Sequence, residues 1–158
     1  IGPDSTVRDS RVGAGCTIVS SLVTGATLRD DVEVGPFSHI RPGSHLESGV
    51  KIGSFGEVSR SWLGRGTRSG HFSYLGDAEI GAKVNIGAGT VTCNFDGVDK
   101  HRIRIGDGAF IGSSSMLVAP VTIGARSRTG AGSVVTCDVP PDSLAVGVPA
   151  RVRDRGDA

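Results

Sequence analysis

Apolar positions along this chain recur about every six residues, which matches neither the period of a helix nor the alternation of a simple strand. An aliphatic residue opens the hexad, glycine usually follows it, and the fifth position is mostly small. The aliphatic-glycine pairs are Ile1-Gly2, Val12-Gly13, Val34-Gly35, Ile52-Gly53, Leu63-Gly64, Ile80-Gly81, Ile86-Gly87, Ile105-Gly106, Ile111-Gly112 and Ile123-Gly124. This hexad predicts a short strand and a tight turn. The aliphatic side chain would point into a narrow core, the small residue would fit the corner, and glycine or asparagine would take turn conformations with positive φ.

Three hexads make one triangular coil, so the repeat predicts a stack of coils joined by parallel strands about 4.8 Å apart. The repeat covers nearly the whole chain and corresponds to roughly eight or nine coils. Helices are disfavoured because 25 of the 158 residues are glycine, and each interior glycine costs a helix about 1 kcal/mol relative to alanine. Most repeat residues should therefore form core and corners, and functional residues should lie where the repeat is interrupted.

Three segments interrupt the repeat. Residues 92–102, "TCNFDGVDKHR", are too long and too polar to stay inside a prism and predict a projecting loop. Residues 69–77, "SGHFSYLGD", replace the usual aliphatic start. Residues 138–153, "DVPPDSLAVGVPARVR", contain prolines that end the repeat. The sequence therefore predicts a β-helix domain over 1–137 and a C-terminal cap and tail over 138–158, because a solenoid needs its terminal hydrophobic layer covered.

Charge and composition exclude several classes of partner. Lysine and arginine number 17 and aspartate and glutamate 16, so the net charge of +1 gives no bulk field to attract nucleic acid. No apolar run approaches about 18 residues and no signal-peptide pattern occurs, which predicts no membrane contact and a cytoplasmic location. The chain begins with Ile1 inside the repeat, so we expect a domain of a longer protein. An odd number of widely spaced cysteines indicates thiols rather than disulfides or a CxxC zinc site; they are Cys16, Cys93 and Cys137.

Three longer stretches carry a family resemblance: "RPGSHLESGVKIGSF", "GHFSYLGDAEIGAKVNIGAGTVTCNFDGVDK" and "IGDGAFIGSSSMLVAPVTIG". Over about residues 34–136 the chain resembles the C-terminal acetyltransferase domain of the bacterial bifunctional enzymes that make UDP-N-acetylglucosamine, a peptidoglycan precursor. The resemblance implies a left-handed parallel β-helix and a homotrimer with active sites shared between subunits. It also implies acetyl transfer from acetyl-CoA to glucosamine-1-phosphate, with no metal needed. No glycine-rich nucleotidyltransferase motif occurs, so uridylyl transfer is not expected of this chain.

Acetyl transfer to an amine needs a group that titrates near neutrality, because the sugar ammonium must lose a proton before its nitrogen can attack a thioester. Of the four histidines only His71 stands in the family pattern "GHxxYLGD", and we predict that it is the base. The resemblance assigns to Glu57, in "FGEVS", the orientation of the imidazole. It assigns to Ser113, in "IGSSS", the stabilisation of the thioester oxygen, with the backbone N–H of Ala88 or a neighbour as a second donor.

The resemblance also supplies the binding residues. Arg41 and Tyr74 match positions that bind the sugar phosphate, a task that suits arginine because it can donate two hydrogen bonds at once. Lys100, on the predicted loop, matches a further substrate contact, and Asn85 and Asn94 match residues that bind sugar hydroxyls. Contacts to acetyl-CoA are expected to be largely with the backbone, which small residues permit; they involve Ala88, Ser113 and Ala131.

Two positions depart from the family pattern. Ser59 stands where a second phosphate-binding lysine is usual, and Arg60 follows it. Because neighbouring side chains on a strand point to opposite faces, a simple replacement by Arg60 is not expected. Gly147 falls near a family arginine that holds coenzyme A, so other arginines would have to contact its phosphates. The candidates are Arg126, Arg128, Arg151 and Arg153.

Three other functions stay open. Ser59 allows an acetyltransferase for another amino sugar or sugar phosphate. A zinc carbonic anhydrase of the same fold would need three histidines that converge between subunits; His39 and His45 are six residues apart and would lie on successive faces, but the spacing of that family is missing. A catalytically silent β-helix scaffold is the non-enzyme alternative, and failure to bind acetyl-CoA would favour it.

Overall fold

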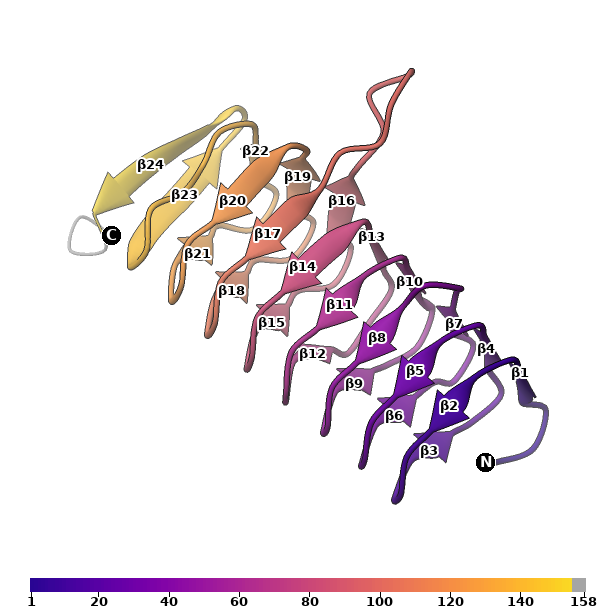
Figure 1. Ribbon diagram of the computed structural model, residues 1–158. Helices are drawn as coiled ribbons and strands as arrows, with labels where there is room; N and C mark the ends of the chain where they lie inside the picture. Colours follow the sequence, from indigo (N-terminus) through magenta and orange to yellow (C-terminus); the bar gives the residue numbers. More distant parts are fainter. Residues whose placement is uncertain (155–158) are drawn as a thin grey trace.

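The computed structural model describes residues 1–154, and within this range it consists of short strands and turns without a helix. The strands form three sheets that the chain visits in turn, so that each circuit adds one coil to a prism (Figure 1). The all-β solenoid with parallel sheets that the hexads predict is confirmed. The first sheet has eight strands, which corresponds to about eight coils.

The first sheet contains β1 (Thr6–Arg8), β4 (Leu22–Thr24), β7 (His39–Ile40), β10 (Gly56–Ser59), β13 (Ser73–Gly76), β16 (Val91–Cys93), β19 (Met116–Val118) and β22 (Val134–Val135). The second sheet contains β2 (Arg11–Val12), β5 (Thr27–Leu28), β8 (His45–Leu46), β11 (Trp62–Leu63), β14 (Ala78–Ile80), β17 (Ile103–Ile105) and β20 (Val121–Ile123). The third sheet contains β3 (Thr17–Ile18), β6 (Glu33–Val34), β9 (Lys51–Ile52), β12 (Arg68–Ser69), β15 (Asn85–Ile86), β18 (Phe110–Ile111), β21 (Arg128–Thr129), β23 (Ser143–Gly147) and β24 (Ala150–Asp154).

The core of the prism is built from aliphatic ladders that run from coil to coil. Ile40 is the register partner of Val58, and Val58 of Leu75, and all three side chains are fully buried. Full burial of such a side chain stabilises the fold by roughly 1.5–3 kcal/mol. The aliphatic residues of the hexad pairs are buried as predicted, apart from Ile1 and Val12. These two lie in the first coil, which has a neighbouring coil on one side only.

The glycine of each hexad pair marks the closest approach of consecutive coils. A Cβ atom at Gly53 would overlap the carbonyl oxygen of Gly70, and one at Gly87 would lie 2.5 Å from the backbone nitrogen of Ser113. The sequence predicts positive φ for the glycine of the hexad, but most pair glycines do not adopt it. The residue with positive φ stands two positions later. That later position also accepts side chains, as Lys83 with a φ of 55° shows. The pair glycine is therefore required for space and not for its backbone conformation.

The small fifth residue of the hexad is buried at the corner, as predicted, and its hydroxyl pairs with the backbone there. Thr90 Oγ1 donates to the carbonyl of Gly87 at 2.7 Å, and Ser115 Oγ donates to that of Gly112 at 2.7 Å. Both side chains are fully buried. Because an unpaired buried polar group is costly, these bonds explain why serine and threonine are favoured at the corner.

Two segments depart from the regular coils. Between β16 and β17 the chain leaves the prism over residues 94–102 as a projecting loop (Figure 1, red). At the other departure, β23 pairs parallel with β21 and antiparallel with β24, so a hairpin follows the last coil. Residues 155–158 of the predicted tail lie outside the described residues. Across residues 1–154 no helix is long and apolar enough to cross a membrane.

Candidate active site

Apart from Glu57, the residues predicted for catalysis and acetyl-CoA binding form a column along one edge of the prism. They occupy the same place, at the corner between the third and first sheets, in consecutive coils. Backbone bonds join the coils there: the N–H of Ser114 donates to the carbonyl of Ala88 at 2.6 Å, and that of Gly132 to Ser113 at 2.8 Å. At about 4.8 Å per coil the column is roughly 14 Å long. Its members, in order, are His71, Ala88, Ser113 and Ala131.

The outer surface of this column is open. His71, Ser113 and Ala131 are exposed, and Ala88 is half-buried. Among the described residues His71 has no hydrogen-bond partner, so its imidazole is available to a ligand. The next residue, Phe72, lines a shallow depression of about 280 Å³ on the first sheet. A ligand that lies along the column can therefore reach the face of the first sheet.

A second group of predicted residues lies on that face. Glu57 on β10 is the register partner of Tyr74 on β13. Arg41, directly after β7, donates from Nη1 to Glu57 Oε1 at 2.8 Å. Within the described part of the chain no hydrogen bond joins Glu57 to His71, which stands three residues before Tyr74, the register partner of Glu57. The orientation of the imidazole by Glu57 stays a prediction.

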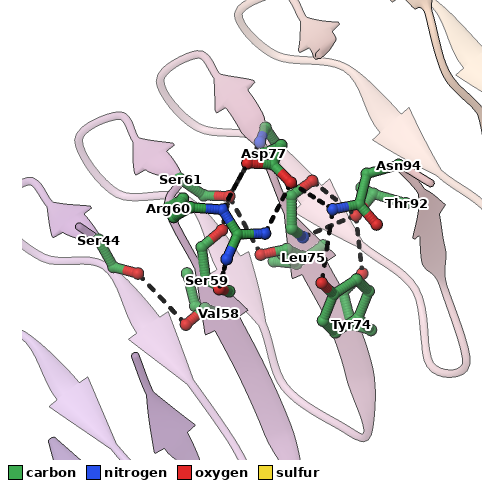
Figure 2. A network of polar contacts seen from close by, with 12 residues as sticks. Ser44, Val58, Ser59, Arg60, Ser61, Tyr74, Leu75, Asp77, Thr92 and Asn94 are labelled. Atoms are coloured by element: carbon green, nitrogen blue, oxygen red, sulfur yellow. Dashed lines mark hydrogen bonds and ion pairs between the residues drawn. The ribbon is translucent and has the colours of Figure 1, made fainter. Parts of the chain in front are cut away.

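Asp77, which was not among the residues predicted for the site, connects this group to the base of the loop. Asn94, which is 5% exposed, donates from Nδ2 to Asp77 Oδ2 and lies 3.5 Å from the phenol oxygen of Tyr74 (Figure 2). Arg60 holds the same carboxylate from another side, with Nε 2.7 Å from Oδ1 and Nη2 2.8 Å from Oδ2. The only signal for Asp77 in the sequence is its place at the end of "GHFSYLGD".

The charges of this network follow from its hydrogen bonds. The bond from Arg60 lowers the pKa of Asp77 most; burial opposes it, and the bond from Asn94 and the charges of Arg60 and Lys100 lower it further. The hydrogen bond to Asp77 is in turn the main reason that the pKa of Arg60 is raised. Arg60 and Asp77 are therefore both ionised near neutral pH, and Lys100 lies near enough to act on the pair.

The loop that carries Lys100 is held by Asp96. Asp96 Oδ1 accepts the N–H groups of Val98 at 2.8 Å and Asp99 at 2.7 Å, and its Oδ2 lies 2.7 Å from His101 Nε2. The bond from Asp99, followed by those from His101 and Val98, lowers the pKa of Asp96 from 3.8 to about 2. Because the pKa of Asp96 is lower in the folded loop, its ionised carboxylate stabilises the loop fully at a pH above the ordinary pKa of 3.8. This contribution is lost as the pH falls through about 2.

One chain does not bring all of the predicted residues together. Asn85 lies on β15 of the third sheet, where its register partner is Phe110. Asn94 and Lys100 instead follow β16, at the opposite end of the first sheet from the corner of His71. Within a single chain the predicted residues therefore form separate groups on either side of the first sheet.

The arginines considered for coenzyme A have different neighbours. Arg126 is held by Asp142, with Nε 2.7 Å from Oδ1 and Nη2 2.6 Å from Oδ2. Arg128 and Arg153 lie in one row across the third sheet, because Leu144 is the register partner of both. These two cations therefore lie on either side of β23, beside the corner of Ala131. Gly147 lies at the turn of the hairpin.

The histidines considered for zinc lie on different sheets of the chain. His39 lies on β7 of the first sheet and His45 on β8 of the second, where His45 Nε2 is 2.9 Å from Glu47 Oε1. In the part of the chain that the structure describes, no three histidine, cysteine, aspartate or glutamate side chains are grouped to hold a metal ion. The three cysteines are free thiols.

Comparison with known proteins gives the class of this chain. The family model for the bacterial transferase hexapeptide (six repeats) matches residues 102–137. A mutant perosamine N-acetyltransferase from Caulobacter crescentus, solved with CoA and GDP-perosamine, is 27% identical with a TM-score of 0.55, over 91% of this chain and 57% of that one. The UDP-N-acetylglucosamine acyltransferase from Campylobacter jejuni, at 15% identity, shares the fold, with a TM-score of 0.70 over 96% of this chain and 73% of that one. The chain therefore contains the hexapeptide repeat, and it shares its solenoid fold with solved acyltransferases.

Within that class its sequence is similar to the bifunctional protein GlmU. GlmU of Thermosipho africanus is 55% identical over 141 residues, which is 89% of this chain and 31% of that protein. GlmU of Geotalea uraniireducens is 49% identical over 157 residues, 99% of this chain and 34% of that protein. The chain thus spans about a third of the length of these relatives and matches their C-terminal acetyltransferase part. The resemblance drawn from the sequence is confirmed.

Proposed function

We propose that this chain transfers the acetyl group of acetyl-CoA to the amino group of glucosamine-1-phosphate and forms N-acetylglucosamine-1-phosphate. The observation that carries the proposal is the column of His71, Ala88, Ser113 and Ala131 along one corner, next to a polar face with several cations. An extended thioester can lie along such a column. The sequence identity of 49–55% to GlmU proteins over most of this chain supports the proposed reaction.

In this proposal His71 removes a proton from the sugar ammonium, and the freed nitrogen attacks the thioester carbonyl. A positioned base of this kind contributes about 10²–10⁴-fold to the rate. The oxygen becomes negatively charged as the C–N bond forms, and the hydroxyl of Ser113 and the backbone N–H of Ala88 donate to it, since the N–H groups of Gly87 and Gly89 are already bonded within the prism. The C–S bond then breaks, the proton held by His71 passes to the leaving thiolate, and the nitrogen releases its second proton to solvent as the amide forms. No metal is needed, because the imidazole and these donors manage both proton and charge.

The acceptor is held through its charge and its hydroxyls. Arg41 and Tyr74 bind the phosphate, and Lys100 reaches the acceptor from the projecting loop. Asn94 and Asn85 bind sugar hydroxyls. The buried Asn94, fixed by its bond to Asp77, supports this role because a pre-positioned amide loses little freedom on binding.

We further propose a cytoplasmic homotrimer with active sites between subunits. About five residues of strand, on the order of 15 Å, separate the corner of His71 from that of Asn94. A hexosamine phosphate is shorter than this distance. The loop of one subunit would therefore serve the column of its neighbour, with Lys100 acting beside the neighbour's corner.

Subunit mixing tests this arrangement. His71→Ala and Lys100→Ala should each impair a uniform assembly, whereas their coexpression should restore activity, because some interfaces then combine an intact His71 with an intact Lys100. Each variant coexpressed with itself is the control, and analytical ultracentrifugation gives the assembly state. A fully active monomer, or mixed trimers without restored activity, would contradict the shared site.

Turnover of acetyl-CoA tests the reaction itself. We expect glucosamine-1-phosphate to be acetylated with a kcat/KM at least about tenfold above that of glucosamine, since hydrogen bonds between charged groups contribute about 1.5–3 kcal/mol. Galactosamine-1-phosphate, which differs from glucosamine-1-phosphate in the configuration of one hydroxyl, tests whether the site distinguishes the sugar hydroxyls. Turnover of another amino sugar alone would favour the alternative acetyltransferase. Absence of both turnover and acetyl-CoA binding would favour a silent scaffold.

A further inference from the structure

We infer that Arg60 supplies the second cation of the phosphate subsite and replaces the side chain that Ser59 lacks. The inference rests on the proposed function and names the feature of the acceptor that Arg60 selects, a phosphate monoester. If the strand continued through Arg60, the alternation of side chains would point Arg60 and Ser59 to opposite faces. The role of Arg60 therefore depends on its backbone conformation.

The backbone at Arg60 does not continue the strand. Arg60 follows β10 in the left-handed region, with a φ of 48°, so the alternation of the strand ends at Ser59. Its side chain turns back, and Nη1 donates to Ser59 Oγ at 3.0 Å (Figure 2). Ser59 is 1% exposed. The guanidinium thus lies over the short side chain of Ser59, in space that a longer residue at position 59 would need for itself.

Ser59 lies among side chains that can donate hydrogen bonds to an anion. Because Ile40 and Val58 are register partners, Arg41 stands beside Ser59 on the adjacent coil, about 4.8 Å away along the prism. On the other side Ser59 is the register partner of Gly76, where a Cβ atom would overlap the phenol oxygen of Tyr74. The side chains of Arg60 and Tyr74 therefore cover these two small residues, and an anion that contacts both arginines would bind on the outer side of this layer.

Arg60 keeps donors for such an anion. Of the five N–H groups of a guanidinium, two bond to Asp77 and one to Ser59; of the other two, one on Nη1 and one on Nη2, the phenol of Tyr74 lies close enough to share a donor with the anion. Asp77 is itself fixed by Asn94, so Arg60 is held in place before the acceptor binds. A phosphate monoester carries about 1.5 to 2 negative charges at pH 7. Since Glu57 and Asp77 each offset the charge of one arginine, the two arginines act on this anion chiefly as hydrogen-bond donors, and Lys100 supplies a further positive charge nearby.

Arg60→Ala tests the inference through the split between KM and kcat. We expect the KM for glucosamine-1-phosphate to rise by about 10- to 100-fold, the effect of one or two charge-assisted hydrogen bonds, with kcat within about threefold. The kcat/KM for glucosamine, which lacks the phosphate, should stay within about threefold as well. Arg104→Ala is the matched control, because it removes an exposed arginine paired with Glu79 on the neighbouring sheet. It should leave both constants unchanged.

A second variant guards against a purely structural effect. Adding Ser59→Lys to Arg60→Ala returns a cation to position 59 and should recover most of the KM. An unchanged KM in Arg60→Ala, or equal losses for glucosamine and glucosamine-1-phosphate, would overturn the inference while the proposed function stands. An inactive wild type would instead refute the proposed function. Calorimetry with N-acetylglucosamine-1-phosphate would then decide about Arg60, since equal or absent binding in wild type and Arg60→Ala overturns the inference.

Discussion

Replacing His71 with alanine is expected to lower kcat for acetylation of glucosamine-1-phosphate by about 10²–10⁴-fold, the usual contribution of a positioned base. His71 is exposed at the end of the column that carries Ala88 and Ser113, and no described residue occupies its imidazole. The loss should therefore be in catalysis and not in folding. Steady-state kinetics measures the effect, and thermal denaturation checks that the melting temperature is unchanged.

His45→Ala is the control for His71→Ala. His45 lies on the second sheet, half-buried and paired with Glu47, away from the column. Its removal should leave kcat within about threefold, because no reacting group is nearby. Partial rescue of His71→Ala by added imidazole would support proton transfer directly. A kcat for His71→Ala within a few-fold of wild type would rule His71 out as the base.

Gly53→Ala is expected to give the largest loss of stability. The new Cβ would overlap the carbonyl oxygen of Gly70 on the next coil, a backbone atom that cannot move without separating two strands. Overpacking of this kind costs typically 1–3 kcal/mol, and a backbone obstacle puts Gly53→Ala at about the upper end. The melting temperature should fall by on the order of 5–10 °C for a chain of this size.

Gly70→Ala provides a matched comparison. A Cβ atom at Gly70 meets no heavy atom within 4 Å, and its φ lies outside the left-handed region. This substitution should change the free energy of unfolding by no more than about 0.5 kcal/mol. Chemical denaturation of the two variants separates the explanations. Equal stabilities would show that glycine after the aliphatic residue serves something other than the approach of coils.

The sequence predicts the fold well because every coil repeats the same local instruction. Residues such as Ile52 and Ile80 are buried for the same reason in each turn, since an aliphatic residue every six positions can face a common core only in a triangular coil. The role of Gly53 was harder to predict. Its need for space depends on the neighbouring coil, and the turn that favours positive φ lies two residues further on.

The candidate site was predictable where it interrupts the repeat. His71, Tyr74 and Lys100 stand in such interruptions and could be named before any coordinates. The pairing of Arg60 with Asp77 could not be predicted, because it depends on the left-handed backbone at Arg60, which turns the side chain toward Ser59. A strand pattern gives the direction of a side chain only while the strand continues.

Each coil of the prism contacts chiefly the coil before it and the coil after it, so local opening should begin at the ends and move inward. The first coil already exposes Ile1 and Val12. The residues from Arg41 to Ser113 belong to interior coils, and the hairpin of β23 and β24 lies beyond the coil of Ala131. Fraying of the outermost turns would therefore leave the reacting groups in register. The end coils in this way protect the candidate site from local unfolding.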